Sequence, residues 1–398
     1  MNRQESMQIA RPPELTADEL RLKLNHLAGI LSGEGFGAIA LCSEGAMRWL
    51  TGLKHQLGDI APPAPAPVNA LVDFSAAGKI KITIISKPFE MPRLKDEIPA
   101  VFEPVPEIEF SFAETYPAPP VSTLTPEHEK YAVVIDAAIR PLLGGFDGNP
   151  FKKIDWISRT AMQALGDAAR RLDEGMNGLV VRGIILEELY RRGIDANLVL
   201  VALAEQESHL HPVASVKYTL EKDRWMKLVI GARYAEHIVS QSLMVKLGGA
   251  VSAEETAVYR ALQTAAVEYA DLYRAGAIER DIYTGLLERF RQVEEETGLT
   301  GFAKSATLHH CGGGTSPLGN RDRMLNPDGK LVCDAWTQFA INPVDVLCGF
   351  KVELQGLILP GGVSPLMLDM HSAAAGIPFH VITAQSGMQA MLPDLMVV

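Results

Sequence analysis

Cysteine is scarce in this chain of 398 residues, which has only Cys42, Cys311, Cys333 and Cys348. Their wide, irregular spacing fits neither a zinc-binding pattern nor a disulfide framework, so we expect mostly buried thiols. Cys311 follows a histidine, but no flanking pattern supports a thiolate–imidazole pair. The cysteines therefore indicate neither a redox protein nor a structural metal site.

Long apolar runs are also missing. No run approaches the roughly 20 residues that a membrane-spanning helix needs, and the first fourteen residues lack the apolar centre of a secretory signal. We therefore expect no membrane association and a cytoplasmic location.

Runs of positive charge are absent as well. The 37 Lys and Arg residues are scattered among 48 Asp and Glu, which gives a formal net charge of -11 and opposes binding to a phosphate backbone. Nucleic acid is therefore not expected as a partner. With 47% hydrophobic and 21% charged residues, the chain has the composition of a globular protein long enough for two domains.

The first part of the chain has the pattern of a small α/β domain. Thr16 and Glu19 have the spacing of a capping box, and leucines then recur at helical intervals until the glycines of SGEGFG. The runs AIALC, ALVDF and KIKITIIS are typical of strands. We assign this domain to residues 1–150, with YPAPPVSTLTPEHEK as the linker.

Residues 151–398 repeat one order of elements. Two predicted helices, at about 155–174 and 179–192, precede the strand runs NLVLVALA, KLVIGARY and HIVSQSLMVKL. Ser252 and Glu255 then cap another helix, IERDIYTGLLERFRQVEEE predicts its partner, and LVCDAWTQFAIN and FKVELQGLIL predict further strands. This order indicates an internal duplication, with a site between the two halves.

Three segments carry a resemblance to a known family. They are RWLTG at 48–52, GMNGLVVRGIILEELYRRG, and ESHLHPVASVKYTLEKDRWMKLVIGARY. In order and spacing the chain resembles the creatinase, prolidase and aminopeptidase P family (M24-like) over nearly its whole length. The resemblance implies an α/β (α+β) fold, with a C-terminal domain of the pita-bread type and a smaller N-terminal α/β domain.

The metal-dependent members of that family bind two divalent metals through two aspartates, a histidine and two glutamates. Aligned on GARY, these positions fall on Val229, Ser240, His310 (or its neighbour His309), Asn342 and Glu353. Only a histidine and one carboxylate are kept, and two ligands do not hold a catalytic two-metal centre. We therefore predict no metal and no cofactor.

The metal-independent member, creatinase, is the more informative comparison. Its histidine base matches His211, and the arginine that holds the substrate carboxylate matches Arg321, eleven residues after His310. Its glutamates that grip a guanidinium match Ser242 and Asn342, which are not anionic. Creatine is therefore not expected as the substrate, since a cationic group would lack a counter-charge.

The resemblance implies a metal-independent hydrolase or lyase that cleaves a C–N or related bond in a small, carboxylate-bearing, amino-acid-like substrate. The predicted catalytic residues are His211, His310 and Glu353. The predicted substrate-binding residues are Arg321, Asn342, Ser240 and His309. A neutral imidazole suits proton transfer near neutral pH, and a guanidinium suits bidentate binding of a carboxylate.

Two alternatives stay open. The chain could be a pseudoenzyme that uses the pita-bread pocket for ligand or partner binding, with the same residues as ordinary surface or core side chains. It could instead be a metallopeptidase whose rearranged ligands come from His209, His309, Glu207 and Glu236. The resemblance also implies a homodimer in which the segment around Lys54 and His55 reaches the partner's site.

Overall fold

The computed structural model describes residues 14–53, 68–76, 78–88, 90–115, 117, 120, 122–125, 127–128, 149–203, 206, 212–307, 312–314, 325, 327–330, 332–333, 335, 338–365 and 376–398. Its first unit contains α1 (Ala17–Gly33), β1 (Ala38–Leu41), α2 (Glu44–Thr51), β2 (Val68–Asp73), β3 (Ile80–Ser86), α3 (Met91–Glu97), α4 (Pro99–Phe102), β4 (Ile108–Ala113) and β5 (Thr123–Leu124).

The strands of this unit form one mixed sheet in the order β4-β3-β2-β1-β5. Thr16 begins α1 as predicted, since its side chain accepts a hydrogen bond from the backbone N–H of Glu19 at 3.1 Å. Leu20, Leu24 and Leu27 on one face of α1 are buried in the core of the unit. The predicted small α/β domain therefore has the expected elements, and the first four residues of the RWLTG segment form the end of α2.

The second unit begins with two helices and a sheet. These are α6 (Asn149–Ala169), α7 (Gly178–Tyr190), β6 (Asp195–Ala202), β7 (Trp225–Tyr234) and β8 (His237–Lys246). The three strands are antiparallel neighbours, and β15 (Met396–Val397) adds to β8 in parallel. A two-residue turn joins β7 to β8, because Tyr234 pairs with His237. Each predicted helix is present, although α6 begins and ends earlier than 155–174.

The same order then repeats. It consists of α8 (Ala253–Ala270), α9 (Glu279–Thr297), the 3-10 helix η3 (Phe302–Thr307), β9 (Gly312–Gly314), β10 (Gln338–Ile341), β11 (Leu354–Leu359) and β12 (Gly362–Pro365). Ser252 and Glu255 form the predicted capping box at the start of α8. The strand in LVCDAWTQFAIN is shorter than predicted, since β10 takes up only its last part.

The chain ends in a hairpin of β13 (Phe379–Thr383) and β14 (Gln389–Pro393) before β15. Met396 is buried in the core of the second unit, and Met388 and Met391 pack against it. Packing is thus one role of the Met-rich C-terminal sequence. Cys42, Cys333 and Cys348 are half-buried rather than fully buried.

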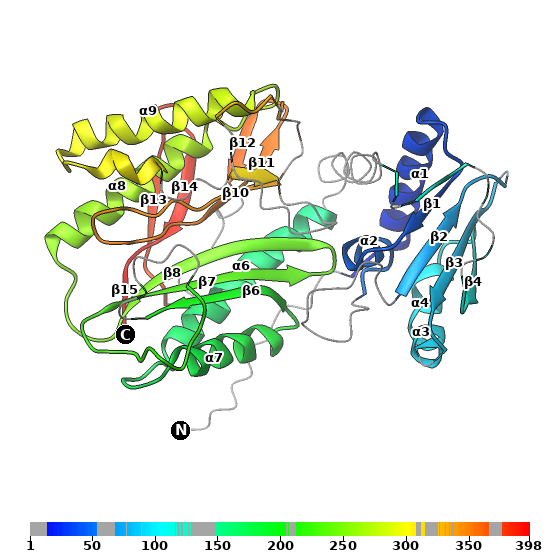
Figure 1. The fold of residues 1–398 in the computed structure, drawn as a ribbon, viewed down its shortest axis with the longest axis horizontal. Coiled ribbons are helices and arrows are strands. Elements are labelled where there is room, and N and C mark those ends of the chain that lie inside the picture. Colours follow the sequence, from blue (N-terminus) through cyan, green and yellow to red (C-terminus); the bar gives the residue numbers. More distant parts are fainter. Residues whose placement is uncertain are drawn as a thin grey trace.

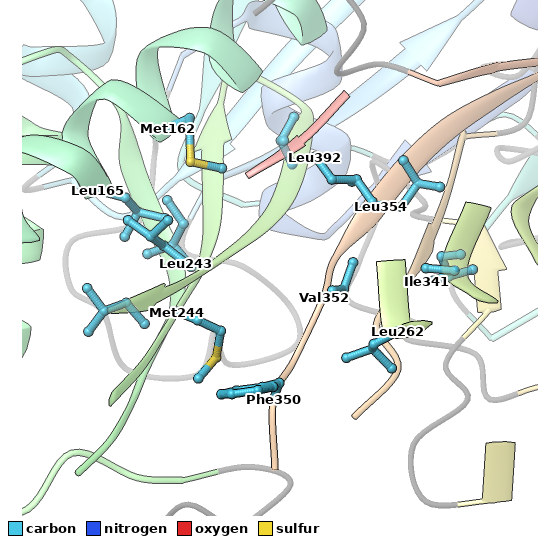
Figure 2. Close-up of a cluster of buried hydrophobic side chains, with 14 of the residues drawn as sticks. Met162, Leu165, Leu243, Met244, Leu262, Ile341, Phe350, Val352, Leu354 and Leu392 are labelled. Atoms are coloured by element: carbon cyan, nitrogen blue, oxygen red, sulfur yellow. The ribbon is translucent and has the colours of Figure 1, made fainter. Parts of the chain in front are cut away.

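The helix pairs of the second unit lie outside its strands. Figure 1 shows α8 and α9 over one side and α7 on the opposite side, with β6, β7, β8, β10 and β11 between them. Figure 2 shows the apolar side chains that join the two halves, among them Leu243 and Met162 from the first and Leu354 and Leu262 from the second. This confirms the predicted α/β class and the pita-bread arrangement.

The boundary between the units stays a prediction. The described part of the first sheet ends at Leu124, and α6 begins at Asn149. Each unit has its own apolar core. Among the helices that the structure describes, none combines the length and apolar character needed to cross a bilayer.

Candidate functional site

The β7–β8 hairpin presents two faces of different character. Side chains alternate between the faces of a strand, and residues paired across an antiparallel ladder share a face. Gln241, paired with Ile230, donates from Nε2 to the carbonyl of Ser158 on α6 at 2.7 Å, so this face lies against the helix. The opposite face, which we call the first inner face, carries Lys227, Val229, Ser240 and Ser242.

The β10–β11 pair supplies a second inner face. Ile341 pairs with Leu354 and Val344 bridges to Lys351, so the same register places Asn342 opposite Glu353. On the other face of this ladder, Phe339 stacks on Tyr273 with ring centroids 4.4 Å apart. The second inner face carries Gln338, Asn342, Lys351, Glu353 and Gln355.

Two hydrogen bonds join the inner faces. The Ser240 hydroxyl donates to Glu353 Oε2 at 2.7 Å, and Gln338 Nε2 donates to the carbonyl of Ile238 at 2.8 Å. Ser240 and Glu353 are 113 positions apart in sequence. The structure therefore brings together two of the predicted site residues, with Asn342 opposite the second of them.

Lys351 supplies the counter-charge of Glu353. Its ammonium lies 3.2 Å from Glu353 Oε1, and the two side chains are 1% and 2% exposed. A buried carboxylate is costly unless it is paired and hydrogen-bonded, and Ser240 and Lys351 together meet both needs. Sequence reasoning missed Lys351, although a lysine within the apolar strand run FKVELQGLIL was a visible signal.

A buried aspartate fixes the loop that carries Lys351. Asp345 Oδ1 accepts hydrogen bonds from the backbone N–H groups of Leu347 at 2.8 Å and Cys348 at 2.6 Å. Its Oδ2 accepts one from Phe350 N–H at 2.6 Å. Burial raises the pKa of Asp345 above its ordinary value despite these hydrogen bonds. These three hydrogen bonds brace the loop from Asp345 to Phe350, directly before Lys351.

Val229 occupies the position that the resemblance assigns to the first metal-binding aspartate. Its side chain is 2% exposed and pairs across the hairpin with Ser242, which is 3% exposed. Neither side chain carries the negative charge of a metal-binding carboxylate, so this buried pair offers no charged ligand to a metal.

Several predicted residues lie outside the described part of the chain. These are Glu207, His209, His211, His309, His310, Cys311 and Arg321, together with Lys54 and His55. Their roles stay predictions.

Glu236 is not available as a rearranged metal ligand. Its Oε1 accepts a hydrogen bond from Lys23 Nζ at 2.6 Å and lies 3.7 Å from Lys153 Nζ. Lys23 is in α1, so Glu236 belongs to the contact between the two units. The expectation that it could join a metal site is therefore wrong, because two buried ammonium groups already neutralise it.

The described residues do not fit a divalent metal centre. Val229 offers no donor atom, Ser240 is a neutral hydroxyl, and both oxygens of Glu353 are engaged by Ser240 and Lys351. Within the residues that the structure describes, no three His, Cys, Asp or Glu side chains come together as a metal-binding group.

Comparison with known proteins agrees with this fold. The family model described as "Metallopeptidase family M24" matches residues 152–335. The search among curated proteins gives no match to this sequence.

Solved structures with the same fold include three peptidases. An Xaa-Pro dipeptidase from Bacillus anthracis has a TM-score of 0.64 at 11% identity and covers 95% of this chain and 100% of its own. The prolidase from Pyrococcus horikoshii OT3 has a TM-score of 0.60 at 14% identity, covering 86% and 97%. The aminopeptidase PepP of Pseudomonas aeruginosa has a TM-score of 0.62 at 10% identity, covering 89% and 95%.

These likenesses show that the two helix pairs and the sheets between them form a fold that the three solved structures share. Residues 152–335 match the model of metallopeptidase family M24, and the chain as a whole is similar in its two-unit pita-bread fold to these dipeptidase, prolidase and aminopeptidase structures.

Proposed function

We propose that the chain is a metal-independent hydrolase or lyase that cleaves a C–N or related bond in a small, carboxylate-bearing, amino-acid-like molecule. The observation that carries this proposal is the hydrogen bond of 2.7 Å from Ser240 to Glu353. It joins directly two positions that the resemblance assigns to metal ligands.

The contact supports metal independence on chemical grounds. In a two-metal site, facing carboxylates are held together by the cations between them. Here a hydroxyl stands opposite the single carboxylate, and the Lys351 ammonium balances its charge. Protein groups alone therefore balance the negative charge of Glu353, and no cation is needed for this purpose.

Glu353 suits a role in proton handling. A carboxylate held by a hydroxyl and an ammonium has a fixed orientation, which a general base or its supporting group requires. In the proposal, His211 takes and returns the proton, His310 and Glu353 orient the reacting groups, and Asn342 and Ser240 donate neutral hydrogen bonds. Arg321 and His309 bind the substrate, with the Arg321 guanidinium on its carboxylate.

A second candidate is a peptidase that acts on Xaa-Pro substrates with a metal. It is favoured by the names of the similar structures, since the three described above are an Xaa-Pro dipeptidase, a prolidase and an aminopeptidase. Identities of 10% to 14% are low, and the neutral residues Val229, Ser240 and Asn342 oppose this candidate. A non-catalytic binding protein is the third candidate.

Elemental analysis separates the first two candidates. Protein purified without added metal should contain far less than one equivalent of Mn, Fe, Co or Zn, and dialysis against a chelator should leave its melting temperature unchanged, since an absent ligand cannot stabilise the native state. One or more tightly held metals per chain would overturn the proposal.

Activity assays test the reaction class. The protein should cleave members of a panel of N-substituted amino acids without metal, and His211→Ala should abolish this cleavage. Cleavage of Xaa-Pro dipeptides only after addition of Mn²⁺ or Co²⁺ would support the peptidase. Absence of cleavage in both panels, with ligand binding intact in His211→Ala, would support the non-catalytic protein.

A further inference from the structure

Arg233 differs from the other cations on the described inner faces. The alternation of side chains along β7 places it on the first inner face. Lys246 and Lys351 each lie within 3.3 Å of a glutamate oxygen, and Lys227 also has a partner. The Nε of Arg233, in contrast, is buried without a hydrogen-bond partner. A buried N–H without an acceptor costs free energy, so this guanidinium needs an explanation.

Two carboxylates near Arg233 are held by a different guanidinium. Asp195 is the β6 partner of Arg233. Its Oδ2 accepts a hydrogen bond from Arg48 Nη2 at 3.1 Å, and its Oδ1 accepts one from the N–H of Ala196 at 3.1 Å. Glu44 Oε1 accepts one from Arg48 Nε at 2.8 Å. Burial, followed by the positive charge of Arg48, lowers the pKa of Arg233 to about 10, although both carboxylates oppose the shift. They therefore do not fully offset the cost of the Arg233 charge.

Gln355 supplies a second unpartnered donor, from the other half of the duplicated unit. It lies on the second inner face, is 1% exposed, and its Nε2 is buried without a hydrogen-bond partner. Its Oε1 lies 3.5 Å from Gln338 Nε2, and the same nitrogen donates to the carbonyl of Ile238 at 2.8 Å. Ile238 is the hairpin partner of Arg233. The Gln338 amide therefore links the level of Gln355 to that of Arg233.

The first inner face becomes more accessible toward the tip of the β7–β8 hairpin. Val229 is 2% exposed, whereas Ser240 and Arg233 are half-buried. Leu198 of β6, which pairs with Gly231 on this face, is 39% exposed. Figure 1 shows this end of the hairpin directed toward the first unit. Solvent therefore reaches the inner face at the level of Arg233, and a small ligand can enter there.

We propose that Arg233 binds the carboxylate of the substrate at the tip end of the inner faces, and that Gln355 donates a neutral hydrogen bond to the same molecule. A guanidinium binds a carboxylate through two parallel N–H donors, and an amide N–H suits a carbonyl oxygen. This inference rests on the proposed function, because it names residues that hold the substrate of that site. It adds two binding residues to Ser240, Asn342 and Arg321.

The test uses N-acetylglycine and its neutral amide, N-acetylglycinamide, as probes in metal-free buffer. The carboxylate should raise the melting temperature of the full chain and the amide should raise it much less, since only a ligand that binds the native state stabilises it. Arg233→Met should weaken the apparent affinity for N-acetylglycine about tenfold or more, the loss expected for a charge-assisted hydrogen bond. Gln355→Leu should weaken it about three- to tenfold, as expected for a neutral hydrogen bond.

Measurements without ligand separate binding from a structural role. The buried donors that Arg233→Met and Gln355→Leu remove have no hydrogen-bond acceptor, so the melting temperature of the ligand-free protein should not fall. Arg233→Lys keeps the charge without the planar fork and should retain part of the response. Arg280→Met changes an arginine that is 56% exposed, and it should leave the melting temperature and the response unchanged.

The inference is overturned if the parent protein responds equally to acid and amide, or to neither, since water alone would then meet these donors. It is also overturned if Arg233→Met binds N-acetylglycine as the parent does, or if this variant melts at a clearly lower temperature without ligand, since the protein would then supply the missing partner.

Metal content is measured on the same samples. Bound metal with an Arg233-dependent response would contradict metal independence alone. Metal-free protein with a response that does not depend on Arg233 would contradict this inference alone.

Discussion

At the scale of single residues, the candidate site depends on how one buried carboxylate is balanced. Glu353 is held by the Ser240 hydroxyl on one oxygen and by the Lys351 ammonium at the other. Removing one partner of a buried ion pair is more damaging than removing both, because the remaining charge has lost its counterpart and its water.

We therefore expect Lys351→Met to lower the free energy of unfolding by about 3 to 5 kcal/mol. The double variant Lys351→Met with Glu353→Gln should be more stable than this single variant. Urea unfolding of the parent, both single variants and the double variant measures the coupling. Additive losses in this cycle would show that the two side chains do not interact in solution.

The neutral residues at the other ligand positions lead to a second prediction. The triple variant Val229→Asp, Ser240→Asp and Asn342→Glu should gain affinity for Mn²⁺ or Zn²⁺ in calorimetry. Without metal it should be less stable than the parent, since new carboxylates in a buried site are costly. The isosteric triple variant with Asn, Asn and Gln at these positions is the control, and equal metal binding by both would contradict the assignment of these positions.

At the scale of elements, the start of α8 is tied to the end of the site strands. Glu255 closes the capping box with Ser252 and accepts hydrogen bonds from Trp225 Nε1 at 2.6 Å and Lys246 Nζ at 3.3 Å. Burial raises the pKa of Glu255, but these contacts outweigh it and lower the pKa to about 2. The helix of the second half is thereby attached to the hairpin of the first.

The lowered pKa predicts an acid-dependent loss of stability. Glu255 binds a proton more readily in the unfolded chain, so its contribution is present above about pH 4.5 and is lost as the pH falls toward about 2. Glu255→Gln should remove this part of the pH dependence.

The capping box gives a further prediction. Ser252→Ala should lower the free energy of unfolding by about 1 kcal/mol, whereas Ser252→Asp should leave it nearly unchanged. The free energy of unfolding, measured between pH 7 and pH 3, tests both predictions. If it depends on pH in Glu255→Gln as it does in the parent, the pKa of Glu255 is not lowered by folding.

At the scale of the whole molecule, buried charges join the two units. Lys23 of α1 donates to Glu236 at the tip of the β7–β8 hairpin and to the carbonyl of Trp49 at 3.0 Å. Lys153 of α6 donates to Glu19 of α1 at 2.8 Å. A second contact joins Arg48 of α2 to Asp195 of β6 at 3.1 Å. The hairpin that carries Ser240 is therefore anchored at its tip in the first unit.

We expect Lys23→Met to destabilise the protein by about 3 to 5 kcal/mol and the double variant Lys23→Met with Glu236→Gln to recover part of that loss. Arg21→Ala is the matched control on the same helix, because its pairs with Asp18 and Glu107 lie at the surface, where ion pairs contribute little to stability. Denaturant unfolding measures all three. A small loss in Lys23→Met, similar to that in Arg21→Ala, would show that the buried cluster does not hold the units together.

His237 beside this cluster predicts a second pH effect. Burial, with Lys153 and Lys23 nearby, lowers the pKa of His237 to about 4, although Glu236 at 3.5 Å opposes the shift. His237 therefore binds a proton at a higher pH in the unfolded chain than in the folded protein. Stability should fall as the pH drops from about 6.5 to about 4. His237→Gln should reduce this fall, as measured by melting temperature across the window. A parent and variant with parallel pH profiles would argue against a neutral buried imidazole.

Local sequence signals predicted most elements of this protein. Thr16 and Ser252 begin their helices because a side-chain oxygen three residues before a backbone N–H is a short-range geometry. The strand-like runs KLVIGARY and HIVSQSLMVKL likewise predicted β7 and β8. The repeated order of helices and strands and the family segments then predicted the fold, and the family alignment predicted Ser240, Asn342 and Glu353 as one group.

The tertiary structure decided the partners of the charged residues. Glu19 has the spacing of a capping partner for Thr16, yet its carboxylate pairs with Lys153, 134 residues away. The sequence shows Lys351 and Lys227 only as lysines within apolar strand runs. The register of the strands places both on the inner faces. The sequence by itself determined the elements, because capping and periodicity act over a few residues. Only the packing of the two halves determined which charges meet, because a buried ion pair depends on side chains that folding brings together from distant positions.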